Sequence, residues 1–126
     1  MPRFVILEHD HPVLHWDLML EAGEVLQTWR LAQPPGPSCE AIEATALGDH
    51  RLMYLDYEGP VSGNRGTVQR WDTGVYAEEP GSRPEARCYL FEGRRVRGRV
   101  RLDHTAGADW LFRYDLTVEP PSAPRQ

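Results

Sequence analysis

Short apolar runs alternate with polar, glycine- or proline-containing turns along the whole of this chain. Residues 3–8 (RFVILE) are compact, apolar and rich in branched side chains, which predicts a buried strand. Residues 14–21 and 24–31 flank Ala22-Gly23 and predict a hairpin. Residues 39–48 are weakly patterned and suit either a strand or a loop. The remaining strands are expected at residues 50–57, 67–71, 88–102 (a hairpin with its turn at Glu92-Gly93) and 108–118.

No segment shows a convincing helical period of 3.6 residues. Turn signals separate the expected strands at regular spacing, and a polar stretch at residues 78–87 is expected to be mobile. About seven or eight short strands with such spacing indicate an all-β barrel or sandwich.

The chain of 126 residues is long enough for one core and too short for two. We expect a single domain over residues 1–118, followed by a proline-rich tail over residues 119–126. No apolar run reaches membrane-spanning length and no signal peptide is evident, so a cytoplasmic location without membrane contact is expected. Cys39 and Cys88 stand far apart without a metal-binding motif, which favours free thiols.

All 14 basic residues are arginine, which excludes lysine nucleophiles and a P-loop lysine. The net charge of −5 argues against generic nucleic-acid binding by bulk electrostatics. Residues 83–126 are nevertheless net positive, with 9 arginines against 6 acidic residues. Alternate arginines at 95–101 would form a stripe on one strand face, which suits a solvated outer face or a phosphate-tracking ridge.

The richest chemistry lies in residues 9–17 (HDHPVLHWD), which hold three histidines and two aspartates. Two imidazoles and one carboxylate suit divalent transition metals and leave coordination positions open for catalysis. On a strand, His15 and Asp17 project from the same face, and Trp16 projects from the other. A turn at residues 10–12 would return His9 to the side of His15, with His11 solvated on that turn.

Five stretches of this chain resemble the 3′-phosphoesterase domain of bacterial and archaeal DNA ligase D and its stand-alone relatives. In chain order they are RFVILEHD, LHWDLMLEAGEVLQTW, GPS, GDHRLMYLDYEG and GTVQRWDTG, and a weaker resemblance continues through GRRVRGRVRL and DWLFRY. The resemblance implies a single-domain antiparallel β-barrel of about eight strands with a manganese-dependent site in a crescent-shaped groove. It also implies removal of a terminal ribonucleoside, and then of the remaining 3′-phosphate, from DNA 3′ ends.

Carried over residue by residue, the resemblance assigns the metal ligands to His9, His15 and Asp17. It assigns an active-site histidine to His50, which would contact the phosphate or protonate the leaving oxygen. A substrate-binding tyrosine falls on Tyr54, which we expect two strand-steps further on the same face.

Two arginines of the family pattern are replaced in this chain, by Met19 and Ile42. In the family the first of them holds the scissile phosphate. The loss of both arginines should weaken substrate binding or transition-state stabilisation by several kcal/mol unless another residue substitutes. Arg30, Arg51 and Arg65 are the candidates. We expect Arg65, on its glycine-flanked loop, to bind the substrate.

Three functions remain open at this point. The first is a Mn²⁺-dependent phosphoesterase acting on DNA or DNA/RNA 3′ ends in repair, with a ligase or polymerase as a partner. The second is a family member that binds metal and DNA ends, or a repair partner, without turnover. The third is a small β-barrel oxygenase, because a His-x-Asp pair with a distant histidine also describes a non-haem iron site.

Overall fold

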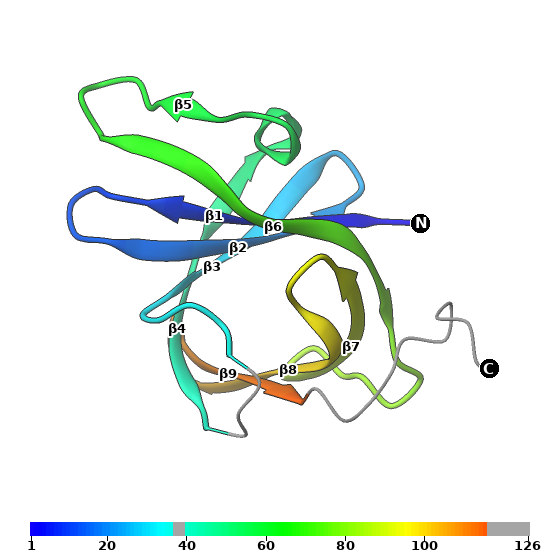
Figure 1. Ribbon diagram of the computed structural model, residues 1–126. Coiled ribbons are helices and arrows are strands. Elements are labelled where there is room, and N and C mark those ends of the chain that lie inside the picture. Colours follow the sequence, from blue (N-terminus) through cyan, green and yellow to red (C-terminus); the bar gives the residue numbers. More distant parts are fainter. Residues whose placement is uncertain (37–39, 116–126) are drawn as a thin grey trace.

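The computed structural model describes residues 1–36 and 40–115, which form one closed antiparallel barrel of eight strands with a ninth, short strand outside it (Figure 1). The expected barrel and the expected strand number are thereby confirmed. The barrel strands are β1 (Arg3–His9), β2 (His15–Ala22), β3 (Val25–Leu31), β4 (Ile42–Arg51), β6 (Thr67–Glu78), β7 (Ala86–Gly93), β8 (Arg97–Ala106) and β9 (Asp109–Asp115).

The strands follow one another around the barrel in the order β1-β2-β3-β4-β9-β8-β7-β6, and pairing of β6 with β1 closes the ring. The long strand β6 also pairs with the short β5 (Gly59–Pro60). A 3-10 turn, η1 (Leu52–Leu55), follows β4 and lies with β5 outside the ring, at the top of Figure 1. This arrangement places η1 against β1, and β5 extends the sheet beyond β6 on the side opposite to β1.

Strands β1 and β2 bury side chains on both faces, because each face has its own apolar cluster. Inward-pointing residues such as Phe4, Ile6 and Leu18 join the barrel interior with Phe91 and Phe112. A second cluster lies on the outer face and consists of Val5, Leu7, Met19, Leu26, Leu55 and Val68. Leu55 comes from η1, so this turn is held against the barrel by burying apolar surface.

Two expected strand boundaries are wrong. Residues 50–57 are not a strand: β4 runs from Ile42 to Arg51, and the chain then turns through η1. The weakly patterned residues from Ile42 onward form a strand because they pair with both β3 and β9. Similarly, β6 continues through Asp72 to Glu78 instead of ending at residue 71, because its second half pairs with β7.

Asp72 has a structural role in the middle of β6. The residue is 2% exposed, and its carboxylate accepts hydrogen bonds from the backbone N–H groups of Thr73, Arg94, Arg95 and Val96 at 2.8–3.1 Å. The turn of the β7–β8 hairpin therefore lies at residues 94–96, slightly later than expected, and is held by a buried carboxylate. Such charge-assisted bonds satisfy donors that the turn leaves free.

Residues 79–85 form a defined reverse turn between β6 and β7. The Glu79 amide donates to the Cys88 carbonyl at 2.8 Å, and Arg83 and Ala86 exchange backbone hydrogen bonds. These hydrogen bonds define the path of this segment, and its mobility stays a prediction. Cys88 is a half-buried free thiol, whereas Cys39, the end of the last expected strand and the tail at 119–126 lie outside the described residues.

Arg97, Arg99 and Arg101 of the arginine stripe lie on β8, which is half-way round the barrel from β2, whereas Arg95 lies in the preceding turn. Val96, Val100 and Leu102 alternate with the stripe and are fully buried, as the pattern predicts. Arg99 forms a bidentate ion pair with Glu79, and Arg101 pairs with Asp103. Because β8 is paired on both sides, the stripe is not on an edge strand.

Among the described residues, no helix has the length and apolar character that crossing a membrane requires.

Candidate metal centre

His9 and His15 face each other across the β1–β2 hairpin, because they are the last residue pair of its ladder. Their imidazole rings are 4.8 Å apart in an edge-on arrangement. The turn at residues 10–14 thus returns the chain beside His9, as the sequence predicts. Trp16, Leu18 and Leu20 point to the barrel interior, and His15 and Asp17 point outward from the same strand.

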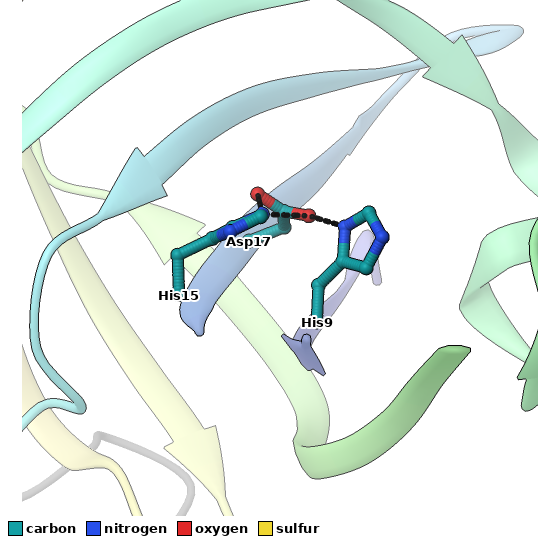
Figure 2. Close-up of side chains that lie close together, drawn as sticks. All are labelled: His9, His15 and Asp17. Carbon is teal, nitrogen blue, oxygen red and sulfur yellow. Dashed lines mark hydrogen bonds and ion pairs between the residues drawn. The ribbon is translucent and has the colours of Figure 1, made fainter. Parts of the chain in front are cut away.

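Asp17 lies between the two imidazoles (Figure 2). Its Oδ2 is 3.4 Å from His9 Nδ1 and 3.3 Å from His15 Nε2. Asp17 and His15 are 4% and 2% exposed, so the group is almost entirely removed from water on this side. One ligand atom from each residue lies within 4.8 Å of the others.

Backbone carbonyls orient both imidazoles. His15 Nδ1 is 2.8 Å from the Val13 carbonyl, and His9 Nε2 is 2.8 Å from the Arg65 carbonyl. Since a carbonyl oxygen only accepts, each of these nitrogens must carry the proton. In the neutral form of each ring, the opposite nitrogens, His15 Nε2 and His9 Nδ1, carry the lone pair and face Asp17, which is the arrangement of histidines that bind a metal.

The donor set fits a divalent transition metal. Asp17 Oδ1 is buried and has no hydrogen bond among the described residues, although it lies 3.2 Å from His15 Nε2 without hydrogen-bond geometry. A buried carboxylate oxygen without a hydrogen bond destabilises the fold unless a cation binds to it. Two imidazole nitrogens and one carboxylate oxygen are suitable ligands for such a cation.

A hollow of about 280 Å³ opens beside this group, on the outer face of the barrel. Its lining comes from β1, β2, β3, β4 and β6, from η1, from residues 61 and 65, and from the turn after His9. The lining residues that bear on chemistry are His9, His11, Asp17, Met19, Arg30, His50, Tyr54 and Arg65. The hollow therefore joins the metal-ligand candidates to the other expected site residues.

His50 and Tyr54 meet at one side of the hollow, with their rings 6.0 Å apart and edge-on. His50 is the penultimate residue of β4, and its Nδ1 lies 2.8 Å from the Gly48 carbonyl. Tyr54 belongs to η1, so the expected reason for their proximity, a shared strand face, is wrong. A tight 3-10 turn brings Tyr54 back toward His50 instead.

The three candidate arginines occupy different places. Arg65 is exposed and lines the hollow, but its Nε donates to the Ser62 carbonyl at 2.7 Å and its Nη2 to the Ser62 hydroxyl at 3.2 Å. Arg51 is the exposed last residue of β4 and lines a neighbouring hollow of about 390 Å³. Arg30 lines the same hollow as Asp17, directly across the β2–β3 ladder from it.

The two positions at which family arginines are replaced also differ. Met19 is buried in the outer apolar cluster and borders the hollow. Ile42 packs into the barrel interior. Sequence reasoning gave Arg30 no preference over Arg65, yet a signal for Arg30 existed. Trp29 and Leu31 had to face the core, so the residue between them had to face the Asp17 side.

Comparison with known proteins identifies one family. The family model for the DNA Ligase D 3′-phosphoesterase domain matches residues 7–105. The chain is 31% identical over 123 residues to the multifunctional non-homologous end joining protein LigD of Mycolicibacterium smegmatis, covering 86% of this chain and 16% of that protein. It is 31% identical over 113 residues to LigD of Pseudomonas aeruginosa, covering 82% of this chain and 13% of that protein.

The multifunctional non-homologous end joining DNA repair protein LigD of Mycobacterium tuberculosis is 33% identical over 116 residues, covering 86% of this chain and 15% of that protein. The chain thus spans only about a sixth or less of the length of these curated relatives. A match over most of the chain, on a closed barrel that gathers the histidines and the aspartate expected of the family, places this chain in the DNA ligase D 3′-phosphoesterase domain family.

Proposed function

We propose that this protein is a metal-dependent phosphoesterase that trims nucleic-acid 3′ ends, with Mn²⁺ as the metal. The observation that carries the proposal is the buried group of His9, His15 and Asp17, which opens into a hollow that also contains His50 and Tyr54. The substrates are DNA or DNA/RNA ends that carry a terminal ribonucleoside or a 3′-phosphate. The family match and the printed role of the relatives in end joining support a place in DNA repair, beside a ligase or polymerase partner.

In this proposal His9, His15 and Asp17 hold the metal ion, which when bound polarises a phosphate oxygen and neutralises developing negative charge. His50 donates Nδ1–H to the Gly48 carbonyl when neutral, which leaves Nε2 for the substrate. As an imidazolium, His50 contacts the phosphate or gives its Nε2 proton to the leaving oxygen. Tyr54 donates its hydroxyl to the substrate and limits the rotation of the His50 ring through their edge-on contact.

The direct test is incubation of the protein with Mn²⁺ and an oligonucleotide duplex that ends in a 3′-ribonucleotide or a 3′-phosphate. The expected products are the 3′-phosphate end and then the 3′-hydroxyl end, separated by gel electrophoresis. His50→Ala should slow product formation by roughly 100-fold or more, the usual contribution of a positioned proton donor. Absence of product from the wild-type protein would reject the phosphoesterase proposal.

A second candidate function is favoured by one observation, namely that methionine occupies the position of the phosphate-holding arginine, at the border of the hollow. A protein with this replacement could keep the metal and bind DNA ends without turnover. In that case Mn²⁺ would still raise the melting temperature through mass action, and DNA ends would bind without being cleaved.

The ligand set has its own test, which does not need turnover. His15→Ala should abolish the rise in melting temperature that Mn²⁺ causes, because it removes a ligand and leaves Asp17 without an oriented partner. His11→Ala is the matched control, since His11 borders the same hollow but lies outside the ligand cluster. Loss of the Mn²⁺ effect in His11→Ala and its retention in His15→Ala would refute the assignment.

A further inference from the structure

The hollow beside the metal-ligand cluster is lined by an arginine, Arg30, whose side chain pairs with no other described residue. The Arg30 side chain makes no hydrogen bond and no ion pair with any residue that the structure describes, and its Nε is buried without a partner. A guanidinium has five N–H donors and remains charged at any physiological pH. Leaving the buried Nε–H unpaired is unfavourable, and an anion bound in the hollow would satisfy it together with the terminal N–H groups.

The β2–β3 ladder fixes where Arg30 stands. It is the cross-strand partner of Asp17, and Met19 pairs with Thr28 two residues further along. Cross-strand partners are about 5 Å apart at Cα, and residues i and i+2 on one strand are about 7 Å apart on the same face. Arg30 and Met19 are therefore both immediate neighbours of Asp17 on the face that carries the ligand cluster.

We propose that Arg30 binds the terminal phosphate of the substrate, in place of the arginine that Met19 has replaced on the adjacent strand. The proposal rests on the proposed function for its substrate class, and it assigns the phosphate to a residue of this chain that the resemblance alone did not assign. A guanidinium that approaches the cluster from β3 instead of β2 reaches the same phosphate beside the metal. It can donate two parallel N–H bonds to two phosphate oxygens.

The alternative arginines are worse placed for this role. Arg65 is exposed, and two of its guanidinium nitrogens already donate to Ser62 within its own loop. What Arg65 contributes to the cluster is its backbone carbonyl, which accepts from His9. Arg51 lines the neighbouring hollow instead of the one that contains Asp17.

The test compares two fluorescent oligonucleotides of one sequence, in Mn²⁺, by anisotropy. One ends in a 3′-methylenephosphonate, a phosphate isostere that cannot be hydrolysed, and the other ends in a 3′-hydroxyl. Wild-type protein should bind the phosphonate end more tightly, and Arg30→Gln should reduce that preference by roughly 10- to 100-fold. Arg30→Lys should restore only part of it, because an ammonium does not bind bidentately. Arg101→Gln, on the far side of the barrel, removes the same charge and should keep the full preference.

The possible outcomes test the Arg30 proposal and the phosphoesterase proposal separately. If Arg30→Gln keeps the phosphonate preference while melting like the wild type, Arg30 does not hold the phosphate. The same conclusion follows if Arg65→Gln or Arg51→Gln loses the preference instead, or if the wild type shows none. If the preference depends on Arg30 but natural 3′-phosphate ends are never cleaved, the Arg30 proposal stands and the phosphoesterase proposal fails. If Arg30→Gln cleaves these ends with an unchanged kcat/KM, the phosphoesterase proposal stands and the Arg30 proposal fails.

Discussion

The Nε2 atom of His9 lies 2.8 Å from the carbonyl oxygen of Arg65, 56 residues away along the chain. This contact fixes the ring so that Nδ1 faces Asp17. The orientation of one metal-ligand candidate therefore depends on the loop at residues 61–66, which contributes backbone and not side chain. The loop is itself closed by a hydrogen bond from the Val61 amide to the Gly66 carbonyl at 2.8 Å.

Gly66→Ala should weaken Mn²⁺ binding although residue 66 does not touch the metal site. Gly66 has a φ of +79°, and a Cβ there would overlap the Asp10 carboxylate and the His11 side chain. The loop must then shift and carry the Arg65 carbonyl away from His9. Loss of such an outer contact typically lowers metal affinity by about 10- to 100-fold, measurable by calorimetric titration. Gly81→Ala is the control, since a Cβ there meets nothing within 4 Å; equal Mn²⁺ affinities of the two variants would contradict the prediction.

Met19→Arg should rescue Arg30→Gln. Both residues neighbour Asp17 on the same face, so an arginine at 19 can donate to the phosphate that Arg30 has lost. We expect kcat/KM for 3′-phosphate removal to fall by roughly 10- to 100-fold in Arg30→Gln and to recover at least tenfold in the double variant. The single variant Met19→Arg should be less stable than the wild type, because Met19 is only 2% exposed. Additive losses in the double variant would show that the two positions do not serve the same phosphate.

Asp72→Ala should destabilise the fold without a direct effect on the metal site. The variant leaves four backbone N–H groups of the β7–β8 turn and of residue 73 without their acceptor. Unpaired buried donors of this kind should lower the free energy of unfolding by roughly 3 kcal/mol, measured by urea denaturation. Asp72→Asn keeps one acceptor oxygen and should cost less. A loss no larger than that of an exposed control, Asp56→Ala, would contradict the role given to Asp72.

Stability should decline in strong alkali because of Tyr76. Burial raises the pKa of Tyr76 from 10.0 to about 12, and the nearby Tyr89 and Glu78 add to the shift. Its hydroxyl donates to the Glu21 carbonyl at 2.8 Å. Since the folded protein favours the protonated phenol, its contribution is complete below pH 10 and is lost as the pH rises toward 12. Denaturation midpoints between pH 9 and 12 should therefore fall less steeply for Tyr76→Phe; equal slopes would exclude Tyr76 as the cause.

The alternation of apolar and polar residues was sufficient to predict which side chains are buried wherever burial depends only on the residue's own strand. Alternation along β2 placed His15 and Asp17 on one face and Trp16 on the other, and alternation along β8 separated arginines from valines. Turn residues after His9 were enough to predict its return to His15. These relationships span few residues, so strand geometry alone determines them.

Pattern failed where pairing with distant strands decided the structure. Residues 42–48 are weakly apolar, yet they form β4 because β3 and β9 supply partners on both sides. Residues 52–55 resemble a strand, yet they form a 3-10 turn because Leu55 covers the outer cluster on β1 and β2. In the sequence Asp72 is typical of a residue that ends a strand. In the structure it lies within β6, because the turn at residues 94–96 supplies hydrogen-bond donors for its carboxylate.

The sequence by itself therefore determined the all-β class, the hairpin that carries the ligand cluster and the identity of the candidate ligands, since these follow from local periodicity and turn chemistry. Only the tertiary structure decided that the Arg65 carbonyl orients His9, that Tyr54 reaches His50 from a turn, and that Arg30 lies across from Asp17 with no partner for its side chain among the described residues. The physical reason is that inter-strand register and loop packing depend on contacts between residues far apart in the chain, which no local pattern records.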